Sequence, residues 1–243
     1  MKTQNLGTSP LISTRLSFGN MRCVGTWNIA EANADRRAAG VAAHVAALEA
    51  GYTLFDTADI YCHGVCEEVL GQFLREVPGA RDRILIATKC GIRFPGDSAP
   101  DAPHRFDFSR QHILWSCDQS LRRMGIDTID LYQLHRPDYL MNPPEIADAF
   151  ETLHRAGKVR YFGVSNFSPS QLTMLQSMLP FPLIVNQVEI HLGRLACFED
   201  GTLDQCIEKN VTPLAWSPLG GGWLGSGASR GPNLNDPLHG QKR

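Results

Sequence analysis

The stretch Phe55-Asp56-Thr57-Ala58-Asp59-Ile60-Tyr61 decides the fold of this chain. It completes the short run Tyr52-Thr53-Leu54-Phe55, which has the composition of a β-strand, and it places two acids and a phenol directly after that run. Packing alone gives no reason for a polar cluster at the end of an apolar strand. Apolar runs that end in Lys or His recur further down the chain. The sequence therefore predicts a scaffold that brings these strand ends together.

Composition limits the classes of protein to which the chain can belong. Its 243 residues are 43% hydrophobic and carry a formal net charge of −2, which allows one sizeable core. A near-neutral charge gives no reason to expect a nucleic-acid or membrane-surface partner, and no apolar run has the length of a transmembrane helix. The seven cysteines have no framework spacing, which predicts free thiols in a reducing compartment, the cytoplasm.

Strand-like runs recur at intervals close to the roughly 30 residues of a strand–helix–strand unit. The runs at 84–87 and 129–132 are apolar rather than alternating, as expected for parallel strands that are buried on both faces. Helix signals fill the gaps, such as Ser109 as an N-cap and Gly125 as a stop. The predicted strands begin near Arg22, Thr53, Ile84, Ile129, Arg160, Ile184 and Thr212.

The repeat favours a (β/α)8 TIM barrel of the α/β class over an open, doubly wound sheet, which the repeat count alone leaves possible. We expect residues 1–219 to form this barrel domain with an N-terminal hairpin. Residues 220–243 are rich in glycine with little apolar periodicity, so we expect a loop or a disordered tail. Seven of the eight strands of a closed barrel are accounted for, and we expect the eighth strand and the last helices to lie outside this sequence.

Four side chains that can take part in proton transfer follow three of the predicted strands: Asp56, Tyr61, Lys89 and His135. In a barrel the carboxyl ends of the strands meet at the active-site face. A buried ammonium stabilises a phenolate and lowers the pKa of tyrosine from its reference value of about 10, while a neutral imidazole can hold a carbonyl oxygen. Such a set donates a proton but no electrons, so we expect a hydride from a nicotinamide cofactor.

Six motifs appear in order along the chain: FDTADIY at 55–61, ATKCG at 87–91, LYQLHRPD at 131–138, FGVSNFSP at 162–169, NQVE at 186–189 and AWSPLGGG at 215–222. Together they resemble the aldo-keto reductases, especially bacterial carbonyl reductases, over about residues 15–225. The resemblance implies a (β/α)8 barrel that reduces an aldehyde or ketone to an alcohol with NADPH. The expected partner is thus a small-molecule carbonyl substrate.

Carried over by motif, the resemblance makes Tyr61 the general acid, and it makes Asp56 and Lys89 the pair that tunes it. His135 would orient the carbonyl group. The residues it places around NADPH/NADP+ are Gly25, Thr26 and Trp27 beside the ribose and substrate, Asp56, Ser165, Asn166 and Gln187 near the nicotinamide, Trp216 stacked on its ring, and Ser217, Leu219 and Gly221 in the following loop. The family's segment that binds the adenosine phosphate is not among the motifs found.

Two other functions remain open at the level of sequence. A metal-dependent barrel lyase or isomerase could use Asp56, Asp59 and His135 as ligands, although Lys89 would repel the metal. A non-catalytic nucleotide-binding or redox-sensing module is the second alternative, because the adenosine-phosphate segment is missing. The sequence leaves the substrate, the NADPH-versus-NADH preference and the oligomeric state undetermined.

Several other features receive structural interpretations. Cys62, His63 and Cys66 have too few ligands at the right spacing for a metal site, so we expect free thiols. Arg136 and Asp138 are expected to pair locally without a catalytic role, and His44 is expected on a helix surface. The glycines at 220–225 match a dinucleotide-binding spacing, but no helix is predicted after them, so we reject a Rossmann fingerprint.

Overall fold

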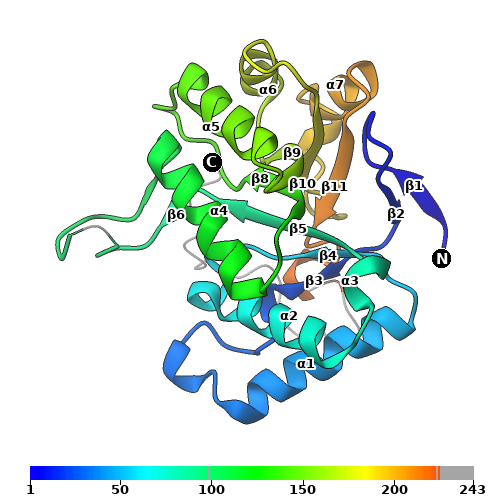
Figure 1. Ribbon diagram of the computed structural model, residues 1–243. Helices are drawn as coiled ribbons and strands as arrows, with labels where there is room; N and C mark the ends of the chain where they lie inside the picture. The colour runs from blue at the N-terminus through cyan, green and yellow to red at the C-terminus, as the bar shows by residue number, and fades with distance from the viewer. Residues whose placement is uncertain (98, 223, 225–243) are drawn as a thin grey trace.

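The computed structural model describes residues 1–97, 99–222 and 224. Their centre is a parallel sheet with the strand order β11-β10-β9-β8-β5-β4-β3, curled into a partial barrel (Figure 1). The outer strands β3 and β11 are not paired with each other in the described part of the chain. The seven strands are β3 (Phe18–Gly19), β4 (Leu54–Asp56), β5 (Leu85–Cys90), β8 (Ile129–Leu134), β9 (Val159–Ser165), β10 (Leu183–Glu189) and β11 (Thr212–Trp216).

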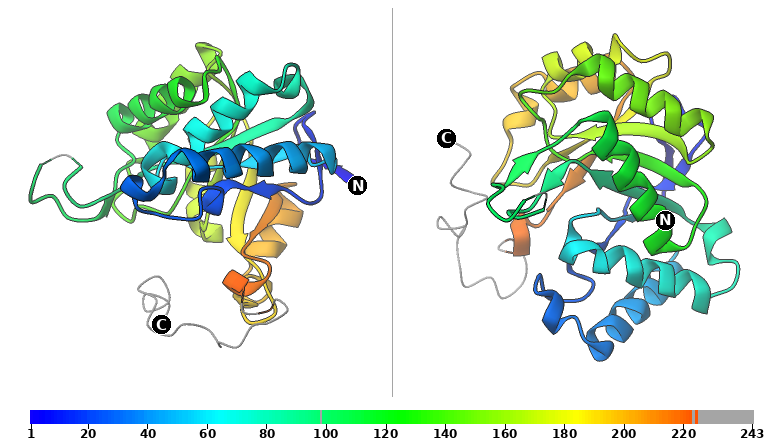
Figure 2. Two further views of the ribbon diagram at one scale, coloured as in Figure 1. Left: turned by 90° about the horizontal axis from the view of Figure 1, so that it is seen from below. Right: turned by 60° about the vertical axis from the view of Figure 1, so that its left-hand side comes forward.

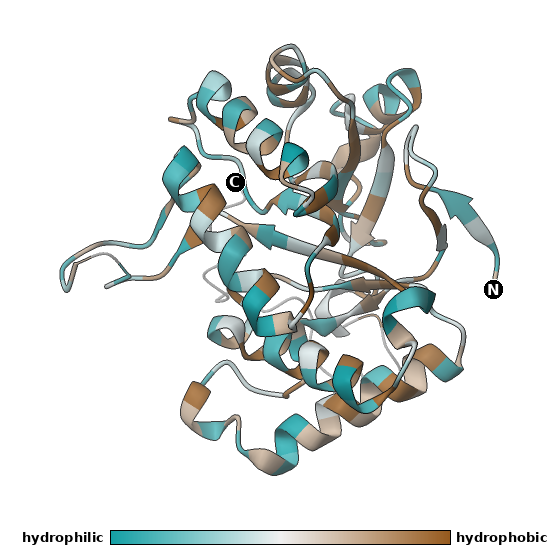
Figure 3. Cartoon of the chain, viewed as in Figure 1, coloured by the Kyte–Doolittle hydropathy of each residue, from teal (hydrophilic) through white to brown (hydrophobic). Residues whose placement is uncertain are grey.

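Helices cover the outer face of this curled sheet, as the rotated views show (Figures 1 and 2). Along the outer helices hydrophilic residues alternate with apolar ones, which is the pattern of helices that bury one face (Figure 3). Ser109 caps α4 by accepting a hydrogen bond from the backbone of His112, and Gly125 ends it with a φ of 66°. The helices are α1 (Ala34–Glu49), α2 (Val65–Glu76), α3 (Ala80–Arg83), α4 (Arg110–Met124), α5 (Pro143–Arg155), α6 (Pro169–Gln176) and α7 (Thr202–Glu208).

The predicted N-terminal hairpin is present as β1 (Thr3–Asn5) paired antiparallel with β2 (Ile12–Thr14). The turn between its strands buries Leu6 and Leu11 against residues of the sheet interior, including Ile184. Gly7 in this turn has a φ of 53°, and a Cβ placed on it would lie 2.7 Å from the Ile184 carbonyl oxygen. Only glycine therefore allows the hairpin to approach the sheet this closely. The hairpin covers the end of the curled sheet away from the predicted catalytic residues.

Two sequence predictions about the fold are wrong in detail. The first strand lies at Phe18–Gly19 rather than near Arg22, which ends the short 3-10 helix η1 (Asn20–Arg22). His44 is 0% exposed and stacks on Phe55 and Phe73 in the core, so it is not a surface residue. Burial lowers the pKa of His44, and the ring is neutral there.

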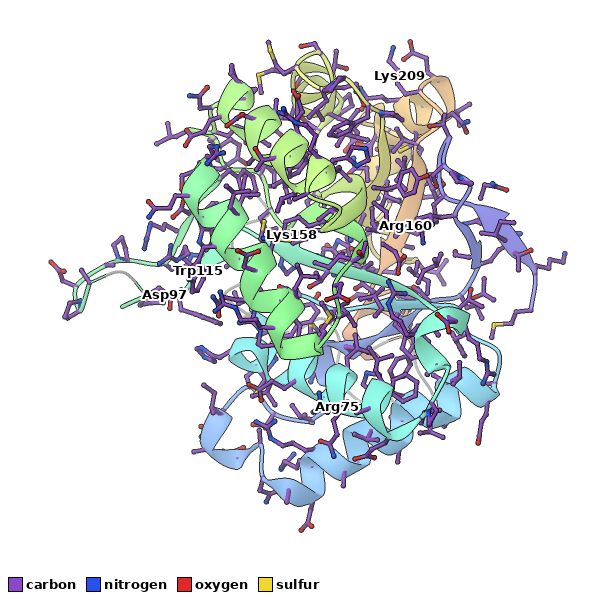
Figure 4. The ribbon with its side chains drawn as sticks, viewed as in Figure 1. Arg75, Asp97, Trp115, Lys158, Arg160 and Lys209 are labelled. Carbon is purple, nitrogen blue, oxygen red and sulfur yellow. The ribbon has the colours of Figure 1, made fainter. Side chains whose placement is uncertain are left out.

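Some elements were not predicted, and some predictions lie outside the described residues. A small antiparallel pair, β6 (Ile92–Arg93) with β7 (Arg105–Phe106), interrupts the repeat after β5 and projects from the molecule near Asp97, which Figure 4 labels. Most of the segment 220–243 lies outside the described residues, so the interpretation of the tail and the domain boundary at 219 stay predictions. Among the helices described, none is long and apolar enough to cross a membrane.

Candidate active site

The fold brings the four predicted proton-transfer residues together at the carboxyl ends of three neighbouring strands. Asp56 is the last residue of β4, Lys89 lies near the end of β5, and His135 directly follows β8. Tyr61 begins the short 3-10 helix η3 (Tyr61–Gly64), five residues after Asp56 in the sequence. Their exposed fractions are 7% for Asp56, 9% for Tyr61, 1% for Lys89 and 8% for His135. Such buried polar residues need partners within the protein.

Lys89 is the centre of this cluster. Its ammonium nitrogen Nζ donates to Asp56 Oδ2 at 2.8 Å and to the Thr57 carbonyl oxygen at 2.7 Å. The third contact is with the Tyr61 hydroxyl oxygen at 3.4 Å. An ammonium has three donors, so these contacts use its full capacity and leave it no competing partner. The Tyr61 hydroxyl is thus held beside the positive charge of the Lys89 ammonium.

Burial and charge oppose each other at Lys89 and Tyr61. Burial pulls the pKa of Lys89 down, but Asp56 and Tyr61 outweigh it, so the pKa of Lys89 lies above its ordinary value. Burial also raises the pKa of Tyr61, and this effect exceeds the opposing effect of the Lys89 ammonium. The expectation that Lys89 brings the pKa of Tyr61 below its ordinary value is therefore wrong for the ligand-free site. The phenol is protonated at neutral pH and retains a proton to donate.

His135 is held as a neutral imidazole. Burial lowers its pKa well below the ordinary value, and the positive charges of Lys89 and Arg136 act in the same direction. Its ring lies edge-to-face with the Tyr61 ring at a centroid distance of 5.6 Å. Its Nδ1 atom is buried without a hydrogen-bond partner among the described residues. A neutral imidazole beside a protonated phenol offers two hydrogen-bond groups to one oxygen atom of a ligand.

A second cluster continues from His135 along the ends of β9, β10 and β11. Ser165 Oγ donates to the Gln187 carbonyl oxygen at 2.8 Å, and Asn166 Nδ2 donates to Ser165 Oγ at 2.8 Å. Trp216 Nε1 donates to Asn166 Oδ1 at 3.0 Å. Asn166 Nδ2 also lies 3.3 Å from the His135 carbonyl oxygen, which joins the two clusters. The sequence-predicted residues at these strand ends therefore form one continuous polar surface.

This second cluster fits the nicotinamide end of a dinucleotide. The Gln187 side-chain oxygen Oε1 is buried and has no hydrogen-bond partner within the described chain. An unsatisfied buried acceptor costs about 1–3 kcal/mol, and the amide nitrogen of a carboxamide would satisfy it. The indole of Trp216 provides a flat ring beside Asn166, on which an aromatic ring can stack. Ser165, Asn166, Gln187 and Trp216 are the residues that would hold the group.

The remaining predicted cofactor residues lie in two loops. Trp27 is 42% exposed and packs edge-to-face on Tyr61 at 6.0 Å, which brings the loop at 25–27 to the proton-transfer cluster. Gly25 in that loop has a φ of 66°, and Thr26 Oγ1 donates to Glu31 Oε2 at 2.8 Å. In the loop after β11, Ser217 and Gly221 have φ values of 49° and 69°, and Leu219 is 59% exposed. The cofactor roles of these six residues stay predictions: Gly25, Thr26, Trp27, Ser217, Leu219 and Gly221.

Arg136 is a candidate functional residue that the sequence analysis set aside. Its guanidinium carbon lies 5.1 Å from the centre of the Trp216 ring, between the two clusters. It forms no ion pair within the described residues, and Asp138 instead accepts a hydrogen bond from the Leu140 backbone at 2.9 Å. Its charge acts to lower the pKa of both Tyr61 and His135. The sequence signal that could have identified Arg136 is its position directly after His135.

The residues proposed as metal ligands in the alternative interpretation point to different partners. Asp56 pairs with Lys89, whereas Asp59 Oδ2 accepts a hydrogen bond from Ser116 Oγ at 2.6 Å. Within the described chain no three His, Cys, Asp or Glu residues lie close enough together to hold a metal ion. A surface hollow lined in part by Arg75 and Arg160, both labelled in Figure 4, lies at the opposite ends of the strands, away from these clusters.

Sequence comparison agrees with this geometry. Residues 15–243 match the aldo/keto reductase family, and the chain belongs to that family. The chain is 47% identical over 176 residues to an uncharacterized oxidoreductase, YcsN of Bacillus subtilis, covering 72% of this chain and 59% of that protein. It is 44% identical over 209 residues to a 6-dehydroglucose reductase of Agrobacterium fabrum, covering 85% of this chain and 70% of the relative. The chain thus spans about three-fifths of the first of these relatives.

Solved structures show the same arrangement of the chain. The glycerol dehydrogenase AKR11B4 from Gluconobacter oxydans superimposes with a TM-score of 0.83 at 30% sequence identity, covering 97% of this chain and 71% of that chain. The aldo-keto reductase AKR11C1 from Bacillus halodurans gives a TM-score of 0.76 at 29% identity, covering 92% of this chain and 68% of its own. The curled seven-stranded sheet is therefore a family arrangement.

Proposed function

We propose that this site reduces an aldehyde or ketone to an alcohol with NADPH. The observation that carries the proposal is the contact of Lys89 Nζ with both Asp56 and the Tyr61 hydroxyl, in a buried cluster whose Tyr61 ring also packs on a neutral His135. Reduction of a carbonyl group needs a hydride at carbon and a proton at oxygen. A bound nicotinamide supplies the hydride, and this chain supplies the proton.

The proton comes from the Tyr61 hydroxyl. Burial keeps this group protonated in the ligand-free site, while the Lys89 ammonium at 3.4 Å stabilises the phenolate that remains after transfer. Asp56 holds the ammonium in place at 2.8 Å. As the proton moves to the substrate oxygen, negative charge develops on the phenol oxygen of Tyr61. The Lys89 ammonium stabilises this charge more in the transition state than in the ground state, and such a difference accelerates a reaction.

His135 positions the carbonyl oxygen. As a neutral imidazole it can donate one hydrogen bond without carrying a charge that would compete with Lys89. The Gln187 acceptor, the Asn166 amide and the Trp216 ring would hold the nicotinamide beside that oxygen. We infer that the sheet is part of a (β/α)8 barrel, in which catalytic groups gather at the carboxyl ends of the strands as they do here.

The finer assignments follow from family membership and chemistry. We propose NADPH rather than NADH from the family resemblance, and the cytoplasm because all seven cysteines are free. The partner we propose is a small polar carbonyl compound, since two relatives are a 6-dehydroglucose reductase and an L-glyceraldehyde 3-phosphate reductase. We expect no nucleic-acid or membrane partner.

The test is direct transfer of a labelled hydride. Purified chain is incubated with NADPH carrying deuterium at the reactive ring carbon and with short hydroxyaldehydes, glyceraldehyde among them. We expect loss of the near-ultraviolet absorbance of NADPH and one deuterium on the carbonyl carbon of the product. Binding of NADPH without turnover of any carbonyl compound would support the nucleotide-binding alternative and refute the reductase proposal.

A further inference from the structure

The three residues directly after Tyr61 share a backbone conformation that side chains rarely adopt. Their φ values are 45° for Cys62, 54° for His63 and 92° for Gly64, and we call these three residues the left-handed turn. A residue with a side chain takes up such a conformation at a cost, so the turn persists only where its surroundings hold it. The turn sets the direction in which the chain leaves Tyr61. The contacts that hold the turn therefore affect the position of the Tyr61 hydroxyl.

A side chain from α4 packs directly on the left-handed turn. Arg123 lies in the last turn of α4, and a Cβ placed on Gly64 would lie 2.7 Å from Arg123 Cδ and 2.8 Å from Arg123 Nε. Only glycine therefore allows this close approach. Arg123 is not free to move aside, because its Nε donates to Glu67 Oε2 at 2.7 Å. The turn thus packs on a guanidinium that Glu67 holds in place.

Glu67 joins this turn to the strand that carries Lys89. It lies in the first turn of α2, three residues after Gly64, and it is 0% exposed. Its other oxygen, Oε1, accepts from Thr88 Oγ1 at 2.6 Å. Thr88 directly precedes Lys89 in β5 and is also 0% exposed. Each oxygen of this buried carboxylate therefore has a partner, one on α4 and one on β5, and it cannot shift without losing a hydrogen bond.

The chain on the other side of Tyr61 is held separately. The backbone nitrogen of Asp59 donates to the Lys89 carbonyl oxygen at 3.1 Å, and Asp59 Oδ2 accepts from Ser116 Oγ at 2.6 Å. Tyr61 thus lies between two anchored points, Asp59 before it and the left-handed turn after it. The Tyr61 hydroxyl oxygen is 3.4 Å from Lys89 Nζ, which is near the limit of a hydrogen bond. A small movement of either anchor therefore breaks this contact.

We propose that Glu67 is a positioning residue for the proton transfer from Tyr61. The inference rests on the proposed function, since it concerns the general acid of that reaction. Among the described residues Glu67 has no hydrogen bond to Tyr61 or Lys89, and it acts through the two side chains that it does hold, Arg123 and Thr88. When these contacts are lost, the left-handed turn relaxes and the Tyr61 hydroxyl moves away from the Lys89 ammonium. The phenolate that remains after proton transfer then loses its stabilising charge.

Two variants loosen this link and leave the reacting groups in place. Thr88→Val removes the hydroxyl that donates to Glu67 and changes no charge, whereas Glu67→Gln keeps the size of the side chain and removes its charge. In both variants the Tyr61 hydroxyl loses the Lys89 contact, so the pKa of Tyr61 should rise by about one unit. The direct effect of removing the Glu67 charge has the opposite sign, because the loss of a nearby negative charge lowers the pKa of a phenol. A rise in the pKa of Tyr61 therefore reports a change of position.

The pKa of Tyr61 is measured without any enzyme assay. The full chain is labelled with fluorotyrosine, which brings ionisation of the phenol into an accessible pH range, and it is titrated by fluorine NMR. Tyr61→Phe identifies the Tyr61 signal among those of the five tyrosines. The matched control is Glu68→Gln, because Glu68 follows Glu67 on α2 and pairs with Arg37 at the same 2.7 Å, but its side chain is 45% exposed. This control should leave the pKa of Tyr61 unchanged.

The two variants and the control decide the proposal together. Should urea unfolding show that Glu67→Gln folds poorly, Thr88→Val alone decides it. A pKa of Tyr61 that stays at or below its value in the unaltered chain would overturn the proposal. An equal rise in Glu68→Gln would also overturn it, because Glu68 holds neither the left-handed turn nor β5.

Turnover is measured separately. We expect Glu67→Gln and Thr88→Val to lower kcat about tenfold, because a displacement of about 1 Å can cost about a hundredfold. NADPH binding should stay nearly unchanged, since Glu67 contacts none of the residues that would hold the nicotinamide. Arg123→Lys, which keeps the charge beside Glu67, should retain more activity than Arg123→Met. A lower kcat with an unchanged pKa of Tyr61 would show a merely structural role and overturn the proposal. A raised pKa in chains that never reduce a carbonyl compound would refute the reductase proposal and leave the link from Glu67 to Tyr61 standing.

Discussion

Replacing Lys89 by Met is the perturbation that separates the structural and chemical roles of the buried cluster. The change keeps an unbranched side chain of similar length but removes the ammonium. It leaves the Asp56 carboxylate, 7% exposed, without its cation at 2.8 Å. Removing one partner of a buried ion pair costs about 3–5 kcal/mol. We expect the free energy of unfolding to fall by that amount.

We expect Lys89→Met to lower kcat by more than the loss of folding stability explains. At the 3.4 Å between Lys89 Nζ and the Tyr61 oxygen, the charge interaction with a phenolate is about 5 kcal/mol at an effective dielectric constant of about 20. This stabilisation exists only after the proton has left Tyr61, so its loss raises the barrier. General acid catalysis typically contributes about 10²–10⁴-fold, and we expect kcat to fall within that range.

The matched control is Lys158→Met. Lys158, labelled in Figure 4, pairs with Asp118 at 2.6 Å, but its side chain is 40% exposed. Exposed ion pairs contribute about 0–1 kcal/mol, so this variant should keep both stability and turnover. Urea unfolding gives the stabilities, and NADPH consumption with excess carbonyl substrate gives kcat. If Lys89→Met matches the control in both measurements, the role assigned to the buried ammonium is wrong.

Three further changes test the electrostatics and packing around the site. Burial and the charge of Glu67 raise the pKa of Asp59 to about 7 in the folded chain, from its ordinary value of 3.8. Between these two pH values the folded chain keeps a proton on Asp59 that the unfolded chain has released. Asp59 therefore makes the free energy of unfolding fall as the pH rises from 3.8 to about 7. Asp59→Asn should remove that fall, worth about 3 kcal/mol between pH 5 and pH 8, in urea unfolding at these two pH values; an unchanged pH dependence would exclude the raised pKa. Gly71→Ala should destabilise by about 1–3 kcal/mol, because its Cβ would lie 2.6 Å from a backbone oxygen of α4, whereas Gly19→Ala meets nothing within 4 Å and should be neutral in thermal unfolding. Arg136→Met should raise the pKa of the His135 imidazole, so the acidic limb of the pH profile of kcat/KM should move to higher pH. An acidic limb at an unchanged pH would show that Arg136 has no role in the site.

The strands and the main site residues were predictable because each has a local signal. Apolar runs buried on both faces gave the positions of β5, β8, β9 and β10, and polar residues directly after such runs marked Asp56, Lys89 and His135. The carboxyl ends of neighbouring parallel strands lie at the same face of the sheet, independently of the conformation of the loops. The positions of these three residues relative to one another could therefore be predicted without knowledge of any contact distance.

What the sequence could not supply depends on contacts between distant segments. His44 has the spacing of a helix surface residue, and only the packing of α1 on Phe55 and Phe73 makes it a core residue. The net direction of the Tyr61 pKa depends on a balance of burial against the Lys89 charge, which no motif encodes.

The most direct test of the central claim compares turnover and cofactor binding in Tyr61→Phe. This change removes the hydroxyl that contacts Lys89 and keeps the ring that packs on His135 and Trp27. NADPH binding is followed by quenching of tryptophan fluorescence, and turnover by NADPH consumption with saturating carbonyl substrate. Nearly unchanged binding with turnover lost is the predicted result. A variant that turns over at the rate of the unaltered chain would show that the proton comes from another group.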